Sequence, residues 1–251
     1  MFDLTGKVAI VTGSSRGIGR AIVEALARAG ANVVVSSRKV DDCEAVAEAL
    51  RKEGRQAVAI PCHIGRREEC SALVEKTRAH WGRIDVLVCN AAVNPYFGPM
   101  TGLTDDAFDK VMQTNVRSNL WLANLVKPEM AERRDGSIII VSSIGGLKGT
   151  EVLGIYAISK AADMQLARNL AVEWGPHNIR VNCIAPGLVR TDFARALWEN
   201  PKLLESTEKR TPLRRIGDPD DIAGAAVFFA SRAGAWTTGQ TIVIDGGVTI
   251  A

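Results

Sequence analysis

Seven short apolar runs, spaced along the whole chain, constrain the fold more than any other feature of the sequence. They cover residues 7–12, 32–36, 56–60, 84–89, 137–142, 179–184 and 240–244. Runs of this length, rich in Val and Ile, are typical of strands buried on both faces, and helix-period segments fill nearly all the gaps between them. The alternation predicts a doubly wound α/β fold, with a seven-stranded parallel sheet and helices on both faces.

No boundary divides the chain into separate domains. The sequence has 251 residues and contains no Pro/Gly/Ser-rich linker, no long run of charge and no internal repeat. A chain of this length fits one large α/β domain or two small ones, and the missing boundary favours one. We therefore expect a single domain over residues 1–251.

Composition and charge limit the classes of partner. The chain is 47% hydrophobic and 24% charged, with a net charge of +3, as is usual for globular proteins. Basic residues are scattered, and the small groups Arg133–Arg134 and Arg210, Arg214 and Arg215 are interpreted as solvated faces. No nucleic-acid partner is expected. No apolar run approaches the roughly 18 residues of a transmembrane helix, so no membrane partner is expected either.

The cysteines and the two ends of the chain favour a reduced, cytoplasmic protein. The cysteines are odd in number and show no C-x-x-C spacing: Cys43, Cys62, Cys70, Cys89 and Cys183. Neither a disulfide framework nor a metal site is expected from them. Residues 1–6 lack the layout of a signal peptide, and residues 248–251 differ from a peroxisomal S-K-L signal.

A glycine-rich turn follows the first predicted strand. Residues 7–12 run into Gly13-Ser-Ser-Arg-Gly17-Ile-Gly19, and apolar residues then recur at helical spacing until Gly30. Glycines allow backbone amides to approach a pyrophosphate, whose charge is stabilised at the positive end of a helix. A plain strand–helix turn can also be rich in glycine, but the complete order of strand, turn and helix favours a Rossmann-like dinucleotide-binding unit.

Tyr156 and Lys160 form a candidate acid–base pair. Their spacing of four places them on one face of a helix, a turn apart, where an ammonium favours the ionised form of a phenol. Ser143 ends an apolar run thirteen residues earlier, and its hydroxyl is suited to holding a substrate oxygen. Y-x-x-x-K is common by chance, but the three residues together predict the interconversion of a carbonyl and an alcohol.

The candidate residues share a position in the predicted sheet, because each group directly follows a strand. In strand order they are Gly13, Ser37, His63, Asn90, Ser143 and Pro186. Open parallel sheets bind their ligands beyond the carboxyl ends of the strands. All six groups are therefore expected at one edge of the sheet, in one site.

With these motifs the chain resembles the short-chain dehydrogenase/reductases. The resemblance is carried by Thr12-Gly13-x-x-x-Gly17-x-Gly19, Asn90-Ala91-Ala92, Asn115, Ser143, Tyr156-x-x-x-Lys160 and Pro186-Gly187. It spans residues 6–247, and one departure is Ala92, where the family usually has glycine. The resemblance implies an oxidoreductase that transfers hydride between NAD(P)(H) and a carbonyl or alcohol, with the hydride chemistry belonging to the cofactor.

The resemblance also implies the roles of individual residues. Tyr156 would donate the proton to the substrate oxygen, and Lys160 would support it and bind the nicotinamide ribose. Ser143 would hold the substrate oxygen, and Asn115 would fix a water near Lys160. Cofactor contacts are implied for Gly13, Ser15, Arg16, Gly17, Ile18, Gly19, Asn90, Ala91, Ala92, Tyr156, Lys160, Pro186, Gly187, Val189 and Thr191.

The ends of the second and third strands bear on which cofactor is used. Ser37 stands where NAD-dependent members hold aspartate, and Arg38 and Lys39 follow it. Together with Arg16, these side chains suit a 2′-phosphate, so NADP(H) is expected, with NAD(H) as the alternative if the basic residues are only solvated. The family's adenine-binding aspartate is replaced by Cys62-His63-Ile64. Contacts from His63 and Ile64 are expected there, although His63 is equally compatible with a plain loop residue.

Two segments are candidates for the substrate pocket, beside Ser143. Asn94, Tyr96 and Phe97 follow the fourth strand in a pattern similar to NADPH-dependent carbonyl (retinal) reductases of the dehydrogenase/reductase member-four type. Residues 188–217 form a connection long enough for a lid. Its Phe193, Leu197 and Trp198 offer an apolar face to a hydrophobic substrate, or else belong to the core of a helix.

Other activities and the assembly are also inferred from resemblance. A 3-oxoacyl-[acyl-carrier-protein] reductase is the main alternative, weakened because one of its two basic docking positions is His177, the other being Arg134. An NAD-dependent alcohol or hydroxysteroid dehydrogenase, or a non-catalytic NADP-binding protein, is less favoured, since all the catalytic residues are present. The family usually forms homotetramers. Candidates for such an interface are the helix with Leu166, Leu170 and Trp174 and the final strand at residues 241–245, unless both faces are buried within one subunit.

Overall fold

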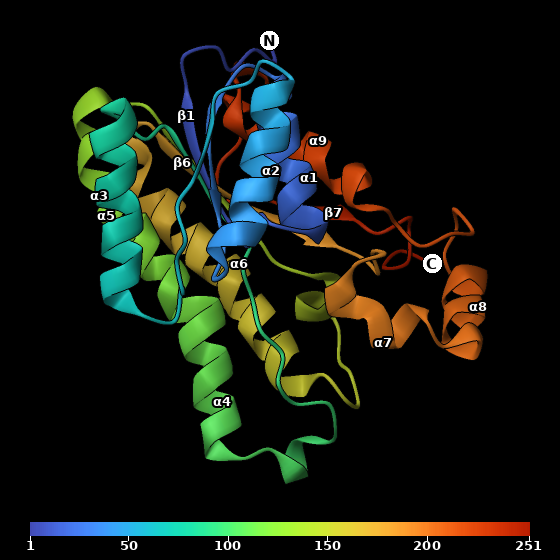
Figure 1. The fold of residues 1–251 in the computed structure, drawn as a ribbon. Helices are drawn as coiled ribbons and strands as arrows, with labels where there is room; N and C mark the ends of the chain where they lie inside the picture. The colour runs from blue at the N-terminus through green and yellow to red at the C-terminus, as the bar shows by residue number, and fades with distance from the viewer.

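One parallel sheet organises the molecule, whose computed structural model describes residues 1–251 (Figure 1). The strands are β1 (Val8–Thr12), β2 (Asn32–Ser36), β3 (Ala57–Ala59), β4 (Val86–Cys89), β5 (Gly136–Val141), β6 (Ile179–Pro186) and β7 (Thr241–Ile244). They lie in the order β3-β2-β1-β4-β5-β6-β7, and every pair is parallel. The predicted doubly wound α/β fold, with its seven strands, is confirmed.

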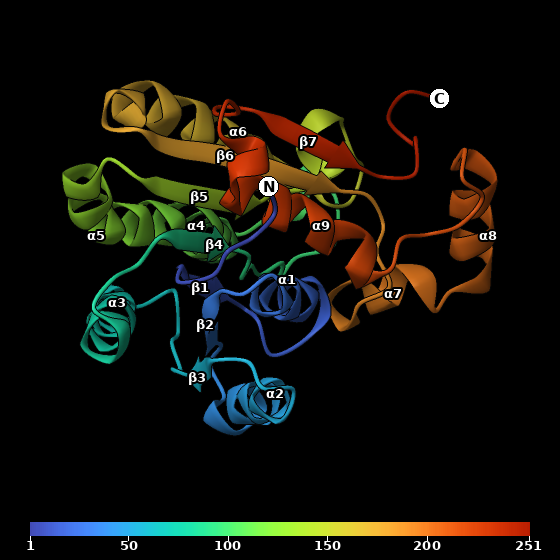
Figure 2. The same cartoon turned by 90° about the horizontal axis from the view of Figure 1, so that it is seen from above.

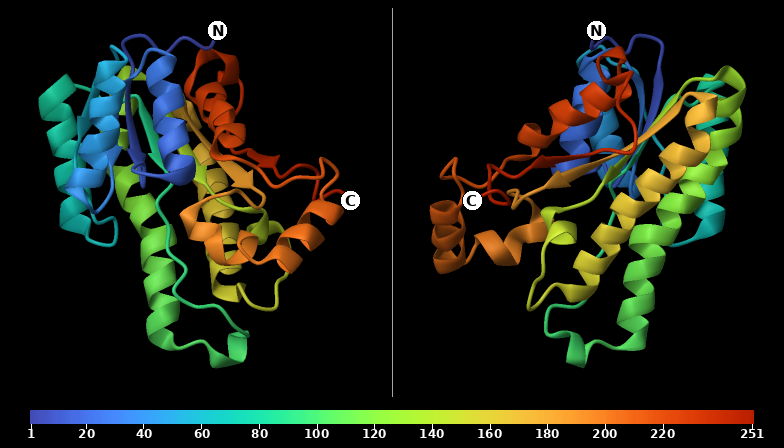
Figure 3. Two further views of the ribbon diagram at one scale, coloured as in Figure 1. Left: turned by 45° about the vertical axis from the view of Figure 1, so that its right-hand side comes forward. Right: turned by 180° about the vertical axis from the view of Figure 1, so that it is seen from behind.

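The helices cover both faces of the sheet (Figure 2). One face carries α1 (Gly17–Arg28), α2 (Val40–Lys52) and α9 (Pro219–Ala230), and the other α3 (Arg67–Trp81), α5 (Ser118–Arg133) and α6 (Gly154–Trp174). Helix α4 (Asp105–Met112) continues into α5 through a π-helical turn, Gln113–Arg117. Short helices α7 (Arg195–Trp198) and α8 (Pro201–Arg210) form a separate arm, drawn in orange in Figure 3.

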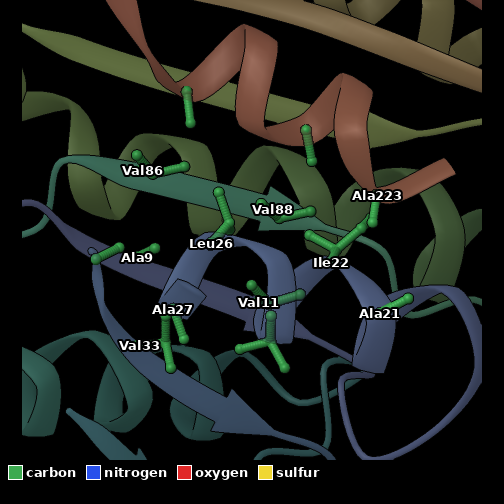
Figure 4. Close-up of a cluster of buried hydrophobic side chains, with 14 of the residues drawn as sticks. Ala9, Val11, Ala21, Ile22, Leu26, Ala27, Val33, Val86, Val88 and Ala223 are labelled. Carbon is green, nitrogen blue, oxygen red and sulfur yellow. The ribbon is translucent and has the colours of Figure 1, made fainter. Parts of the chain in front are cut away.

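Side chains of the strands alternate between two apolar cores. Val33 and Val35 face the core beneath α1 and α9, whereas Val34 between them faces the core beneath α3, α5 and α6. Figure 4 shows the first core, with Ile22 and Leu26 of α1 packed above Val11. Burying each such side chain contributes roughly 1.5–3 kcal/mol. The unbroken apolar runs of the sequence thus follow from burial on both faces.

The two ends of the sheet differ in composition. At the amino ends of the strands, the buried carboxylate of Asp85 accepts hydrogen bonds from the Val8 amide (2.9 Å) and from Arg83. The Lys7 ammonium lies 3.7 Å from the same carboxylate. At the carboxyl ends lie the glycine turn and the other residues predicted to form a site. The expected sorting of the candidate residues to one edge agrees with the topology.

Helix α6 presents a different surface from the one expected. Leu170 and Trp174 are buried in the core, and Leu166 packs against it. The expectation that Leu170 and Trp174 form an interface with another subunit is therefore wrong, because the core of the same subunit already covers them. For half-buried Leu166 it stays a prediction. Val172 (82% exposed) and Ile158 (45%) lie on the outer face. None of the helices is long and apolar enough to span a bilayer.

Candidate active site

The glycine turn forms a cradle at the start of α1. Gly13 and Gly17 have φ angles of 66° and 56°, which favour glycine. A Cβ on Gly19 would lie 2.3 Å from the carbonyl oxygen of Gly13, so no side chain fits there. No side chain caps the helix at Arg16, and its first amides can therefore bind an anion. The residues present fit the pyrophosphate of a dinucleotide.

Asn90 holds this cradle from the end of β4. Its Nδ2 donates to the carbonyl oxygens of Thr12 (2.9 Å) and Gly13 (3.2 Å). The Thr12 hydroxyl accepts in return from the amides of Asn90 (3.0 Å) and Ala91 (3.2 Å). Asn90 and Ala91, both predicted to contact the cofactor, thus also lock the turn to the neighbouring strand. Ala92 follows, half-buried, at the same edge.

The side chains at the end of β2 leave a basic surface. Arg38 and Lys39 are exposed, and neither pairs with a carboxylate. Ser37 lies 3.1 Å from Cys43 through its hydroxyl. Arg16 in the glycine turn reaches Asp192 at 3.4 Å, a contact between exposed side chains that is worth little energy. Two guanidiniums and an ammonium therefore remain accessible to a phosphate.

Several residues predicted to contact the cofactor have side chains that are buried in the core or already hydrogen-bonded within the protein. Ile64 and Val189 are buried in the two cores, so they can meet a cofactor only through their main chain. The Nδ1 atom of His63 accepts from the Gly65 amide at 3.1 Å, which leaves Nε2 free. Thr191 approaches the glycine turn, since a Cβ on Gly17 would lie 3.2 Å from its methyl group.

Ser143 and Tyr156 meet around Gly145. A Cβ on Gly145 would lie 3.4 Å from the Ser143 hydroxyl oxygen and 3.9 Å from the Tyr156 ring. Ser143 follows β5 and accepts from the Gly145 amide at 3.0 Å, while Tyr156 begins α6. The competing hydroxyl of Ser142 is buried and donates to the carbonyl of Lys160 (2.7 Å). The geometry thus favours Ser143 over Ser142 as the hydroxyl that holds the substrate oxygen. The spacing of thirteen residues between Ser143 and Tyr156 favours the same residue.

Lys160 is almost fully buried, one helical turn from Tyr156. Its Nζ lies 5.7 Å from the centre of the Tyr156 ring and donates to the carbonyl of Val141 (2.9 Å) and to the carboxylate of Asp163 (3.0 Å). Burial alone would lower the pKa of Lys160, but the Asp163 carboxylate and Tyr156 more than offset this and hold that pKa above its usual value. The lysine is therefore an ammonium at neutral pH.

Asn115 occupies the π-helical turn between α4 and α5. Its Oδ1 accepts from the Val93 amide at 2.8 Å, and its Nδ2 donates to the Val93 carbonyl at 3.0 Å. Its Nδ2 also donates to the Ser159 hydroxyl at 3.1 Å. Because π-turns occur mainly as local bulges at functional sites, a turn at this residue fits a special role. Sequence periodicity predicts only an ordinary helix here.

A large cavity of about 1110 Å³ is lined in part by the segment that connects Ser143 to Tyr156. Its wall is formed by Ile144, Leu147, Lys148, Leu153, Leu188, Leu197, Leu203, Thr207, Arg210, Thr211, Arg215, Ile216, Asp245, Val248, Thr249 and Ala251. More than half of these residues are apolar, and they come from the segment after β5, the arm of α7 and α8, and the residues after β7. Such a wall suits a hydrophobic molecule, bound along the segment that connects Ser143 to Tyr156.

Three of the residues predicted to bind substrate lie in the arm or just before it, and their contacts differ. Leu197 lines the cavity, and the Phe193 ring stacks obliquely 5.9 Å from the Tyr156 ring. Trp198 instead donates through Nε1 to the carbonyl of Thr191 at 2.8 Å. Its indole holds the start of the arm in place and does not line the cavity.

The loop after β4 reaches the start of α6. The Gly98 amide donates to the carbonyl of Val152 at 2.9 Å, which holds this loop against the residues just before α6. Asn94 has a buried Oδ1 without a hydrogen-bond partner, so it can still accept from a ligand. Tyr96 donates to the carbonyl of Pro99 (2.7 Å), and Phe97 is 61% exposed. Of these residues, Asn94 has the strongest case for a ligand contact.

The structure adds four residues that sequence reasoning missed. Asp163 and Asn119 lie behind Lys160, and Lys148 and Arg210 line the cavity. Arg210 and Arg215 are exposed, as predicted, and both also line the cavity. A charged residue one turn after a catalytic lysine was the only signal for Asp163. The cavity cations have no local signal, because they come from segments far apart in the chain.

Comparison with known proteins places the chain among oxidoreductases. The family model described as enoyl-(acyl carrier protein) reductase matches residues 13–249. Dehydrogenase/reductase SDR family member 4 of Sus scrofa is 43% identical over 244 residues, which cover 97% of this chain and 88% of the relative. The human protein of the same name is 42% identical over the same length and coverage.

Two solved structures share the whole fold. A gluconate 5-dehydrogenase from Burkholderia cenocepacia, in complex with NADP and tartrate, has a TM-score of 0.95 and 32% identity, covering 100% of this chain and 98% of its own. A 7α-hydroxysteroid dehydrogenase, complexed with NADH and 7-oxo glycochenodeoxycholic acid, has a TM-score of 0.95 and 38% identity, with coverage of 98% and 95%. Likeness of fold therefore extends to proteins crystallised with either nicotinamide cofactor.

Proposed function

The chain belongs to the short-chain dehydrogenase/reductase family, and we propose that it is an NADP(H)-dependent carbonyl reductase for hydrophobic substrates. As a member of the family it is an oxidoreductase that acts on alcohol or carbonyl groups with a nicotinamide cofactor. The choice of NADP(H) rests on the end of β2. Ser37 stands there without a carboxylate, and Arg38 and Lys39 are exposed and unpaired, as a 2′-phosphate requires.

Proton transfer falls to Tyr156 in this proposal. Its phenol donates to the substrate oxygen during reduction, and the Ser143 hydroxyl holds that oxygen in place. The Lys160 ammonium, 5.7 Å from the ring centre, stabilises the phenolate that remains. When bound, NADPH supplies the hydride. Asn115 would support the return of a proton from water toward Lys160.

The cofactor would lie along the carboxyl ends of the strands. The amides from Gly13 to Gly19 would hold the pyrophosphate, and Asn90 keeps their turn in shape. Lys160 would bind the nicotinamide ribose, and the residues after β6 would border the nicotinamide. Of these, Pro186 ends the strand, and the Gly187 amide donates to the carbonyl of Ile244 at 2.9 Å.

The cavity supports a hydrophobic substrate that also carries an acidic group. Its wall includes three basic residues, of which Arg215 is paired with Asp221. Lys148 and Arg210 have no carboxylate partner, and the one acidic side chain in the wall, Asp245, accepts from main-chain amides. The two similar structures described above were also solved with acids, tartrate and 7-oxo glycochenodeoxycholic acid. We infer a preference for carbonyl compounds with a carboxylate.

A substrate panel with both cofactors tests this proposal. Purified protein would be assayed with aromatic and aliphatic ketones, aldehydes and dicarbonyls, each as a neutral compound and as its carboxylate analogue. We expect reduction with NADPH at least about tenfold faster than with NADH at limiting cofactor, in line with one lost charge-assisted contact. Equal use of NADH and NADPH would contradict the cofactor assignment. Inactivity on every carbonyl compound would contradict the reductase assignment.

A 3-oxoacyl-[acyl-carrier-protein] reductase is the second candidate, and one contact favours it. Asn178 donates to the carbonyl of Arg134 at 2.7 Å, so Arg134 and His177 lie close together, where an acidic carrier could dock. The description of the matching family model also names an acyl-carrier-protein substrate. Acetoacetyl thioesters in the same panel separate the two candidates, because a carrier reductase would reduce them faster than aromatic ketones.

We also propose a homotetramer in the cytoplasm. Large apolar side chains on α4, α5 and α6 remain exposed, among them Phe108 (40%), Leu120 (36%) and Val172 (82%), and contact between subunits would cover them. All five cysteines are unpaired thiols, which supports a reducing compartment. Light scattering tests the assembly, and a strictly monomeric species would contradict it. Cell fractionation tests the compartment.

A further inference from the structure

A buried carboxylate, Asp163, lies directly behind the catalytic lysine and takes no part in the reaction described above. The residue is fully buried on α6, one turn after Lys160. One oxygen accepts from the Lys160 ammonium at 3.0 Å, and the other accepts from Nδ2 of Asn119 at 2.9 Å. A carboxylate removed from water is costly unless both its charge and its lone pairs are matched. Here one ammonium faces the charge and each carboxylate oxygen accepts one hydrogen bond, although burial still holds the pKa of Asp163 above its usual value.

Asn119 connects Asp163 to Asn115. The same Nδ2 donates to the main-chain carbonyl of Asn115 at 2.6 Å. A chain of hydrogen bonds therefore runs from Asn115 through Asn119 and Asp163 to Lys160, and all four residues are buried. Asn115 and Lys160, at the two ends of this hydrogen-bonded series, are the residues expected to return the proton. Asn119 and Asp163 lie between them and therefore fix their relative positions.

The ammonium of Lys160 is oriented by two fixed acceptors. A lysine has three N–H donors, and two of them point to the Val141 carbonyl (2.9 Å) and to the Asp163 carboxylate. Val141 belongs to the sheet and Asp163 to the core of α6, so neither acceptor can move far. The third N–H is the one left for the cofactor ribose.

We propose that Asp163 and Asn119 are positioning residues for proton transfer, which hold the Lys160 ammonium charged and aimed between Tyr156 and the cofactor. This inference rests on the proposed function of the site, because it assumes that Lys160 serves Tyr156 during carbonyl reduction. Neither residue touches the substrate. Their effect reaches the reaction through the lysine alone.

No other ionised group faces Asp163. Besides the lysine, α6 brings Tyr156, β4 brings Cys89, β6 brings Cys183, and α5 brings the neutral amide of Asn119. Burial raises the pKa of Cys183 to about 12 and raises the pKa of Cys89 as well, so both thiols stay neutral across the working range. A change in pH dependence at this position can therefore be assigned to the pair of Lys160 and Asp163.

Asp163→Asn should shift the pH profile of reduction in a defined direction. Without the carboxylate, the buried ammonium of Lys160 loses its proton at lower pH. Loss of the ammonium moves the alkaline limb of kcat/KM to lower pH, by about one unit or more.

The experiment compares Asp163→Asn with Asp163→Leu and with a control at the other end of the sheet, Asp85→Asn. Asp85 is an equally buried aspartate, so the control removes a buried charge far from the site. Measurements are pH profiles of kcat and KM with NADPH, NADPH affinity by fluorescence titration, and thermal unfolding. We expect the alkaline limb to move and kcat to fall at least about tenfold at pH 9 in both Asp163 variants. The Asp85 variant should only unfold at lower temperature.

Each outcome decides the question. Wild-type profiles in folded Asp163 variants would overturn the inference, while an inactive wild-type protein would instead overturn the proposed function. If neither Asp163 variant folds, Asn119→Leu keeps the ion pair and removes the link to Asn115. A smaller shift in the same direction, with KM unchanged, then supports the inference, and an unmoved profile with unchanged kcat refutes it.

Discussion

Asp85 and Asp163 are both buried aspartates, one at each end of the sheet, and their surroundings differ in kind. Asp85 accepts from the Val8 amide and Arg83, with the ammonium of Lys7 nearby, and those cations reach partly into solvent. Asp163 has one cation, and that cation is itself buried. The first carboxylate closes the amino end of the fold with replaceable surface partners, whereas the second has a single partner with chemistry of its own.

The difference follows from the parallel sheet. Every loop that leaves the carboxyl end of a strand can bring a side chain to one site, as Asn90, Ser143 and Pro186 do. Loops at the amino end serve only to connect and to seal. A buried charge therefore stabilises the fold at one end and tunes a reaction at the other. Four variants, two of them double substitutions, test that distinction, in order of expected effect.

Tyr156→Phe should remove the chemistry and leave the fold. Loss of the phenolic proton is expected to lower kcat at least about a thousandfold, because no neighbouring group replaces the donor. NADPH affinity, measured by fluorescence titration, should stay within about threefold, since the hydroxyl faces the substrate. Residual reduction near the wild-type rate would show that the carboxyl end works through another acid.

Asp85→Asn should destabilise the fold and leave the activity unchanged. The amide cannot match the hydrogen bonds and charge around Asp85, so we expect the free energy of unfolding to fall by about 2 kcal/mol. Urea titration measures this loss, and kcat per folded molecule should not change. A lower kcat at unchanged stability would show that the two ends of the sheet are coupled, and the distinction between them would fail.

Arg38→Ala combined with Lys39→Ala should weaken NADPH and spare NADH. Each cation at the end of β2 can make a charge-assisted bond to the 2′-phosphate, so we expect KM for NADPH to rise about tenfold. The control is Arg55→Ala. It removes an exposed cation just before the amino end of β3, far from the carboxyl end of β2 where Arg38 and Lys39 lie. Equal changes for both cofactors would indicate a general loss of charge instead of phosphate recognition.

Lys148→Ala combined with Arg210→Ala should give the smallest change. Both cations are exposed, so their attraction for a substrate carboxylate is screened. We expect KM to rise about fivefold for a carboxylate-bearing ketone and to stay constant for its neutral analogue. Steady-state kinetics at low salt measures the difference, and an identical effect on both ketones would refute the acidic-substrate preference.

Most of the fold could be predicted from local patterns in the sequence. Each strand is a short apolar run because both of its faces are buried, so β1 to β7 could be located to within about two residues. The glycine turn was visible because the φ angles of Gly13 and Gly17 strongly favour glycine. Periodicity failed at Leu170 and Trp174, since an apolar stripe does not reveal whether the sheet or another subunit covers it.

The site was predictable where a motif has a fixed spacing, as between Ser143, Tyr156 and Lys160. It was not predictable where packing between distant segments decides the role of a residue. Asp163 resembles any solvated charge on a helix until α5 is seen to cover it. Lys148, similarly, gains its place only because the arm of α7 and α8 encloses the cavity.

The π-turn at Gln113–Arg117 has one further consequence, which concerns insertions and deletions. A turn of this kind holds one residue more than an α-helical turn, and it absorbs that residue locally. Because the longer turn rotates the chain about as far as one α-helical turn, deleting Val116 would restore regular helix and leave the phase of α5 relative to α4 nearly unchanged. Asn119 would still face Asp163. The bulge at Asn115 is thus a feature that can be removed separately from the residues behind Lys160.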